Sequence, residues 1–305
     1  MSIETRSPRR GRFAPSPTGP LHFGSLVAAT ASYLDAKSGG EWLLRIEDLD
    51  LARNVAGAAD SILHDLEALG FEWDGPVTWQ TQRGDLYRAA LEHLRGQGRL
   101  FGCACTRREI ADSALGADGA RVYPGTCRDG LPPGRSARAF RLRVESEHIG
   151  FVDRLLGPVS QHLAQSVGDF VLLRADGQVA YQLAVVADDA DQGVTDVVRG
   201  ADLVDSTPRQ ILLQRLLGLP TPTYLHLPVA VDAAGEKLSK QTRAHPIDTG
   251  RPQSAVCAAL AFLGHAPPFQ PETITLAEIW SWALAHWDPA LIPATRRRPA
   301  AVTAP

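Results

Sequence analysis

The chain has 305 residues, of which 21% are charged, and its formal net charge is −3. This length can bury a large hydrophobic core and predicts one large domain with insertions or two domains. The near-neutral charge excludes a globally basic nucleic-acid-binding protein, so RNA binding would need a local patch. Residues 1–12 lack the apolar segment of a signal peptide and no run reaches membrane-spanning length, which predicts a cytoplasmic protein without a membrane partner.

Strand-like and helix-like segments alternate along the first hundred residues, as an α/β fold requires. From Gly102 to Arg138 this periodicity fails, because cysteines, glycines and prolines dominate, and we expect an irregular insertion. The first elements are predicted as strands at 12–14 and 42–46 and helices at 25–38, 56–69 and 86–94.

Beyond the insertion, Phe151–Val186 is predicted to form strands, with Asp176-Gly177 as a hairpin turn. A further strand is expected at Val194–Arg199, and a helix begins at Thr207-Pro208 and runs to Leu217, with proline in its favoured first turn. The sequence therefore predicts an α/β nucleotide-binding fold whose parallel sheet is split by an insertion. Its expected parts are a first half at 1–102, an insertion at 103–190 with a hairpin at 103–138, a second half at 191–245 and a short helical region at 246–305.

Two separated segments indicate a nucleotide site. Around His22-Phe23-Gly24, a strand, a Pro/Gly turn and a helix start combine backbone N–H groups with a helix dipole, which together attract anions. His22 can donate to phosphate oxygens, and Gly24 leaves room for a flat base. Far along the chain, the polar loop Lys237–Gln241 can fold over a triphosphate. The pair predicts ATP binding, although either segment alone is more often half-buried or solvated surface.

A cysteine cluster marks the insertion. Cys103, Cys105 and Cys127 supply three thiols, which is most of a tetrahedral zinc site. No histidine lies between residues 103 and 127, so Asp118 or water is one possible fourth ligand. A Cys-x-Cys pair could equally be redox-active or inert. Cys257 lies in an apolar segment and is expected to pack in the core.

Together these segments resemble the class I glutamyl-tRNA synthetases. His22-Phe23-Gly24 matches the His-Ile-Gly-His signature of that class, and Lys237–Gln241 matches its Lys-Met-Ser-Lys-Ser loop. Three further blocks match the glutamate branch, at Ala14–Gly19, Arg45–Asp48 and Gly193–Gly200. The resemblance spans about residues 11–245 and implies the Rossmann-like catalytic fold of this class.

The chain after Gln241 is too short for the helical half that reads the anticodon in the full enzymes. It is therefore more similar to their short paralogues, the glutamyl-Q tRNA(Asp) synthetases. That resemblance implies a ligase that activates L-glutamate with ATP and Mg²⁺. It also implies transfer to the queuosine base at the wobble position, with the anticodon arm of tRNA(Asp) as partner and no obligate protein partner.

Two other functions remain open. A truncated glutamyl-tRNA synthetase would charge a tRNA 3′ end, and a non-catalytic paralogue would only bind RNA. The presence of His22, Gly24, Lys237 and Lys240 argues against the non-catalytic reading, because a protein without catalysis has no need of them.

The resemblance also implies site residues. The catalytic set is His22, Gly24, Lys237, Ser239 and Lys240, of which His22, Gly24 and Lys240 contact ATP.

For the glutamate pocket the resemblance implies Arg12 and Arg199, whose planar forks suit a carboxylate, and Glu47, which receives the ammonium group. Arg45 and Asp48 are expected to have structural roles only. The pocket is completed by Ala14, Ser16 and Tyr181.

The family supplies a tyrosine as the fourth zinc ligand. Tyr123 has the matching spacing to Cys127, so one structural Zn²⁺ is implied on Cys103, Cys105, Tyr123 and Cys127. A phenol has a pKa near ~10 and ligates zinc only when the metal helps to remove its proton.

Overall fold

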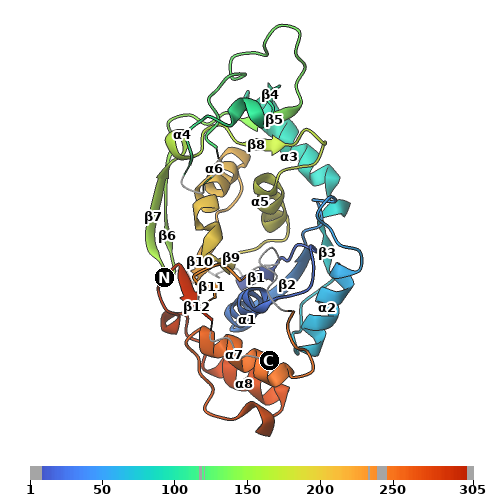
Figure 1. The fold of residues 1–305 in the computed structure, drawn as a ribbon, viewed down its shortest axis with the longest axis vertical. Coiled ribbons are helices and arrows are strands. Elements are labelled where there is room, and N and C mark those ends of the chain that lie inside the picture. Colours follow the sequence, from blue (N-terminus) through green and yellow to red (C-terminus); the bar gives the residue numbers. More distant parts are fainter. Residues whose placement is uncertain (1–8, 117–118, 120, 233, 239–245, 301–305) are drawn as a thin grey trace, which may run out of the picture.

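The computed structural model describes residues 9–116, 119, 121–232, 234–238 and 246–300. The molecule is elongated, with antiparallel strands at one end, parallel strands in the middle and two helices near the C-terminus at the other end (Figure 1). This arrangement confirms the expected α/β fold. Among the described residues, no helix is both long and apolar enough to span a membrane.

The first sheet is parallel throughout. Strand β1 (Arg9–Phe13) pairs with β2 (Gly40–Ile46), and β2 pairs with β3 (Thr78–Trp79). Helix α1 (Phe23–Lys37) connects β1 to β2 and is buried along most of its length, and α2 (Ala58–Ala68) follows β2. These bounds confirm the predicted strand–helix–strand start of the chain.

The second sheet has the strand order β7-β6-β10-β9. Its central strand β10 (Thr223–Leu227) is parallel to both β9 (Asp196–Gly200) and β6 (His148–Asp153). The outer strand β7 (Gly157–His162) is antiparallel to β6.

The two sheets meet where β9 approaches β1. The backbone N–H of Thr195 donates to the carbonyl of Arg10 at 2.9 Å, and the N–H of Arg10 donates to the Thr195 hydroxyl at 2.8 Å. Parallel strands from both halves of the chain therefore lie together, and their carboxyl ends share one edge. In open α/β sheets that edge is where ligands bind.

The insertion forms its own antiparallel sheet at one end of the molecule (Figure 1). Strand β5 (Ala139–Leu142) lies between β4 (Leu100–Cys103) and β8 (Val171–Leu173). Helix α3 (Gly84–Gly96) leads from the first sheet into this region, and the short helix α4 (Leu163–Ser166) precedes β8.

The prediction of strands throughout residues 151–186 was wrong in part, because α4 and α5 (Tyr181–Asp191) are helical. Residues Leu183–Asp189 of α5 are all buried, so no polar face reveals the helical period in the sequence. The hairpin turn at Asp176-Gly177 is confirmed, since Gly177 has a φ of 81° and the N–H of Arg174 donates to the carbonyl of Gln178. The predicted helix from residue 207 is confirmed as α6 (Thr207–Leu217).

The C-terminal part closes the other end of the molecule. Helices α7 (Pro252–Phe262) and α8 (Leu276–Ala285) share a hydrophobic core with α1 and the first sheet, and β12 (Arg297–Pro299) pairs in parallel with β11 (Val229–Val231). Cys257 is buried within α7, which confirms its expected place in the core.

An aromatic cluster joins α8 to the first sheet. The ring of Trp280 lies 5.0 Å from that of Tyr33 and 4.8 Å from that of Phe71, and Tyr33 lies edge-on to Trp42 at 5.1 Å. The indole N–H of Trp280 donates to the carbonyl of Leu69 at 2.9 Å. Such aromatic pairs stabilise a core beyond the area they bury, so α8 is an integral part of the half of the molecule that contains the first sheet.

Candidate active site

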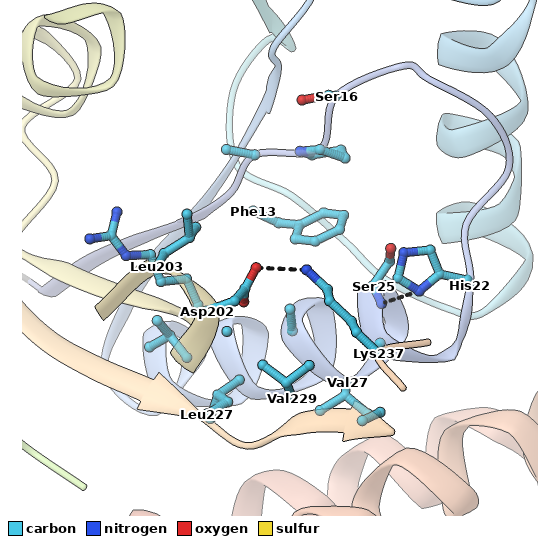
Figure 2. A pocket seen from close by; sticks show the side chains of 18 of the residues that line it. Phe13, Ser16, His22, Ser25, Val27, Asp202, Leu203, Leu227, Val229 and Lys237 are labelled. Carbon is cyan, nitrogen blue, oxygen red and sulfur yellow. Dashed lines mark hydrogen bonds and ion pairs between the residues drawn. The ribbon is translucent and has the colours of Figure 1, made fainter. Parts of the chain in front are cut away.

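A cavity of about 580 Å³ opens at the carboxyl ends of the parallel strands, beside the start of α1 (Figure 2). Its lining includes residues from β1, β9 and the turns that follow β2 and β10. Ser239 and Lys240 lie outside the described residues. All the other predicted catalytic and glutamate-pocket residues line this one cavity, namely Arg12, Ala14, Ser16, His22, Gly24, Glu47, Tyr181, Arg199 and Lys237.

The turn at His22 caps helix α1. The imidazole Nδ1 accepts a hydrogen bond from the backbone N–H of Ser25 at 3.3 Å, which places the proton of the neutral ring on Nε2. A Cβ at Gly24 would lie 3.2 Å from the His22 ring and 3.4 Å from the carbonyl oxygen of Leu238. Glycine at position 24 therefore lets the helix start approach the segment that carries Lys237.

Lys237 reaches across the cavity from the opposite side (Figure 2). Its ammonium group lies 2.6 Å from a carboxylate oxygen of Asp202, which belongs to the 3₁₀ turn Ala201–Ser206 after β9. The N–H of Leu238 donates to the carbonyl of Ala230 at 2.9 Å, so the backbone beside Lys237 is fixed to β11. The ion pair is partly solvated, and such pairs exchange readily for a phosphate partner.

A buried cluster of opposite charges lies beneath the other side of the cavity. Arg12 donates to both carboxylate oxygens of Asp189, from Nε at 3.1 Å and from Nη2 at 3.3 Å. Arg45, which is fully buried, lies 2.8 Å from Asp189 and 3.3 Å from Glu47. Burial alone would raise the pKa of Asp189, but Arg12 and Arg45 outweigh it and hold the pKa below its usual value. The cluster fixes Arg12 in place before any ligand binds.

Glu47 follows β2 and belongs to the same cluster. Burial raises the pKa of its carboxyl group, against the opposing charges of Arg45 and Arg12. An ammonium group of a ligand would restore charge balance here. The structural role expected for Arg45 is confirmed, as is that of Asp48, which accepts from the N–H of Thr81 at 2.9 Å and from its hydroxyl at 2.6 Å.

Arg199 projects from β9 with a different set of partners. Its Nη2 donates to the Thr207 hydroxyl and to the Gln210 side-chain oxygen, both at 2.8 Å. Its Nε donates to Nε2 of His226 at 3.1 Å, so the proton of this imidazole is on Nδ1, 2.6 Å from Asp153. Burial lowers the pKa of His226, which keeps the ring neutral.

One donor of Arg199 is left over. Its Nη1 is buried and has no hydrogen-bond partner among the described residues. A buried unsatisfied charged donor is costly, and an incoming carboxylate would satisfy it. Because Arg199 lines the cavity, this donor is a candidate contact for an acidic side chain of the ligand.

Sequence reasoning missed the residues that hold the arginines. Asp189, Asp153 and His226 have no motif of their own, and they become functional candidates only once their partners are known. A signal was nevertheless available, because Asp188-Asp189 interrupts an apolar segment and buried carboxylates are rarely left unpaired.

The cysteine cluster is brought together as predicted. The sulfur atoms of Cys103, Cys105 and Cys127 lie within 4.8 Å of one another, and those of Cys105 and Cys127 are 3.6 Å apart. The Tyr123 hydroxyl lies 3.4 Å from the sulfur of Cys103 and 3.6 Å from that of Cys105. Thiolates bound to zinc at about 2.3 Å in a tetrahedron would be about 3.8 Å apart, so this donor set fits the metal. Asp118, the competing fourth ligand, lies outside the described residues.

Comparison with known proteins places these features in a family. Residues 9–285 match the family model described as tRNA synthetases class I (E and Q), catalytic domain. A glutamyl-Q tRNA(Asp) synthetase of Aromatoleum aromaticum is 61% identical, covering 96% of this chain and 93% of the relative. One from Geobacter sulfurreducens is 52% identical, covering 93% of both chains.

A solved structure agrees with the sequence comparisons. The glutamate–tRNA synthetase of Elizabethkingia anophelis superposes with a TM-score of 0.78 at 25% identity, covering 96% of this chain and 68% of that chain. The chain therefore belongs to the class I tRNA synthetases of the glutamate and glutamine branch. Within that class, it belongs to the family of the glutamyl-Q tRNA(Asp) synthetases.

The buried cluster makes a prediction about stability. Asp189→Asn leaves two buried arginines short of a counter-charge and should lower the free energy of unfolding by about 3 kcal/mol near pH 7. Because the pKa of Asp189 is depressed in the folded state, its contribution is present above about pH 4 and is lost as pH falls further. The difference between wild type and variant in chemical denaturation should therefore shrink below about pH 4.

Asp191→Asn is the matched control, because Asp191 lies in the same helix but is half-exposed and pairs with Arg83 at the surface. It should cost less than about 1 kcal/mol. Equal losses for the two variants would show that the Asp189 cluster is not a stabilising centre.

Proposed function

We propose that this chain activates L-glutamate with ATP and transfers it to the queuosine base at the wobble position of tRNA(Asp). The observation that carries the proposal is the buried Nη1 of Arg199, which has no hydrogen-bond partner among the described residues and belongs to a residue that lines the same cavity as His22 and Lys237. The names of the curated relatives support the same substrates.

In the first step, an oxygen of the glutamate α-carboxylate attacks the α-phosphorus of ATP, a P–O bond forms, and pyrophosphate leaves. The site needs no covalent intermediate, so its contribution is positioning and charge stabilisation. His22 donates from Nε2 to phosphate oxygens, and Lys237 exchanges Asp202 for the triphosphate. The family resemblance assigns Ser239 and Lys240 to the same step, and Mg²⁺ enters with ATP as part of the substrate.

The glutamate pocket divides its work between the two ends of the amino acid. Arg199 binds the side-chain carboxylate through Nη1, and Arg12, which lines the same cavity, is the second arginine of the pocket. Glu47 receives the α-ammonium group, which Tyr181, Ala14 and Ser16 enclose. In the second step, a hydroxyl of the queuosine ring attacks the activated carbonyl. A C–O bond forms, AMP leaves, and the hydroxyl proton is released.

Zinc has a structural role in this proposal. Cys103, Cys105, Cys127 and Tyr123 hold one Zn²⁺ in the insertion, where it stabilises the loop between β4 and β5. Burial and the neighbouring thiols raise the pKa of Tyr123. The phenol would therefore lose its proton only when its oxygen binds the metal.

The function is tested with an anticodon stem-loop of tRNA(Asp) and labelled glutamate. The stem-loop carrying queuosine should accept glutamate, and the same stem-loop carrying guanosine should not, since it lacks the ring that receives the ester. Intact tRNA(Glu) serves as the second substrate. Label on the 3′-terminal adenosine of tRNA(Glu), with none on the queuosine stem-loop, would replace the proposal with a truncated glutamyl-tRNA synthetase.

Arg199→Lys tests the carboxylate contact. A single ammonium group cannot reproduce the forked guanidinium, so the KM for glutamate should rise about 100-fold in ATP–pyrophosphate exchange, while the KM for ATP changes by less than about threefold. Arg215→Lys, at an exposed position on the neighbouring helix α6, is the control and should leave both values nearly unchanged. Equal increases in the two KM values for Arg199→Lys would remove this residue from the glutamate pocket.

The purified protein should carry about one zinc per chain by elemental analysis, as expected of a closed four-ligand site. Cys103→Ser should lower the metal content, whereas Cys257→Ser should not, because Cys257 is buried in α7 away from the cluster. A fully active preparation without zinc would rule the metal out.

A further inference from the structure

A second cavity, of about 560 Å³, lies between α3 and the hairpin that follows β8. It has no part in the reaction described above. Its walls combine apolar side chains, amides, arginines and one carboxylate, among them Leu49, Leu51, Arg88, Glu92, Arg95 and Gln178.

This cavity adjoins the active-site cavity. The segment after β2 separates them, with Leu51 on the side of the second cavity and Arg53 on the side of the first. The Cα atoms of two residues so close in sequence are at most about 7 Å apart. Asp50 fixes this partition, because its carboxylate binds Arg53 at 2.7 Å and Arg174 of the β8 hairpin at 3.2 Å.

Helix α3 presents a stripe of suitable chemistry to the cavity. Arg88, Leu91 and Arg95 lie three and four residues apart and therefore share one face. Arg88 pairs with Asp85 at 2.8 Å and Arg95 pairs with Glu92, in both cases within one exposed turn. Such pairs contribute little to stability and can be exchanged for a phosphate, which an arginine binds with two parallel hydrogen bonds.

The remaining walls suit a nucleobase. Leu51 is 61% exposed, so its apolar surface is open to a ligand in this cavity. This surface and that of Leu49 can pack on the face of a flat base, and Gln178 supplies an amide group for its polar edge. Proteins recognise single-stranded RNA in this way, by unstacking bases and binding their faces and edges separately.

We propose that the second cavity binds an unstacked nucleotide of the anticodon loop, next to the nucleotide that enters the active site. The apolar walls hold the base, and Arg88 and Arg95 hold its phosphate. This inference rests on the proposed function, since it requires an RNA loop as substrate. It assigns to α3 and the β8 hairpin the task of holding that loop while the queuosine reaches the activated glutamate.

The test separates RNA use from glutamate activation. Gly84 lines the cavity, and a Cβ placed there meets no atom within 4 Å. The tryptophan of Gly84→Trp can therefore fill the cavity without a clash at its Cβ atom. Arg88→Glu reverses the charge at the rim. Each variant should lower kcat/KM for the queuosine-containing stem-loop about tenfold or more, with glutamate-dependent ATP–pyrophosphate exchange within about twofold of wild type.

Gly84→Ala and Arg215→Glu are the matched controls, because alanine leaves the cavity open and Arg215 is an exposed arginine on α6 outside it. Both should transfer glutamate to the stem-loop as wild type does. Wild-type transfer by Gly84→Trp and Arg88→Glu would overturn the assignment while leaving the proposed function intact. A wild-type enzyme that cannot modify the stem-loop would overturn both.

A free nucleotide has the same base and phosphate as a nucleotide of the RNA loop and is the alternative occupant of this cavity. A nucleoside monophosphate is therefore added to the exchange assay of wild type and of Gly84→Trp. The RNA assignment predicts no difference between the two proteins in its effect. The monophosphate could instead change the exchange rate of wild type but not that of Gly84→Trp, while both proteins transfer glutamate to the stem-loop equally. That result would show a site for free nucleotides and overturn the RNA assignment.

Discussion

The ion pair between Arg12 and Asp189 is the interaction on which the rest of the site depends. It joins β1, from the first half of the chain, to α5, at the end of the expected insertion. Arg45 extends the contact to β2 and Glu47. Because a charge is stable in a buried position only when it is paired, these residues can be buried only together. Folding the chain thus aligns the strand ends that carry the proposed glutamate pocket.

The neighbouring Asp188 has hydrogen-bond partners of its own. Its carboxylate accepts from Gln80 at 2.7 Å and from Arg83 at 2.6 Å, and the Tyr87 hydroxyl donates to it at 2.9 Å. Two consecutive aspartates on one helix therefore hold different partners, with Arg45 in reach of both: Asp189 holds Arg12 of the proposed glutamate pocket, and Asp188 holds the start of α3. Both the active-site cavity and the cavity proposed for RNA therefore depend on contacts of one buried helix, so a common element would position the RNA loop and the activated amino acid.

The nucleotide end of the site is held more loosely. His22 caps α1 through Ser25, and Gly24 allows the segment of Lys237 to approach, yet the pair between Lys237 and Asp202 remains partly solvated. A preformed amino acid pocket beside an exchangeable lysine suits an enzyme whose triphosphate must enter and whose pyrophosphate must leave.

Local motifs made much of this site predictable from the sequence. The turn at His22 and the three cysteines have short spacings, so their contacts follow from nearby residues. The fully buried helix α5 was mistaken for strands because burial on all sides hides its period. Asp189 and His226 could not be assigned, since each acts on an arginine that is distant in sequence, at 177 and 27 residues. Contacts of that kind exist only once the parallel strands are in register.

The central claim is that buried ion pairs hold the glutamate pocket ready before the ligand arrives, with one donor of Arg199 reserved for it. A crystal structure of the protein with bound L-glutamate tests this most directly. The account predicts the side-chain carboxylate within hydrogen-bonding distance of Nη1 of Arg199, the ammonium group beside Glu47, and Arg12 still paired with Asp189. Glutamate bound away from Arg199, or Arg12 released from Asp189 on binding, would contradict it.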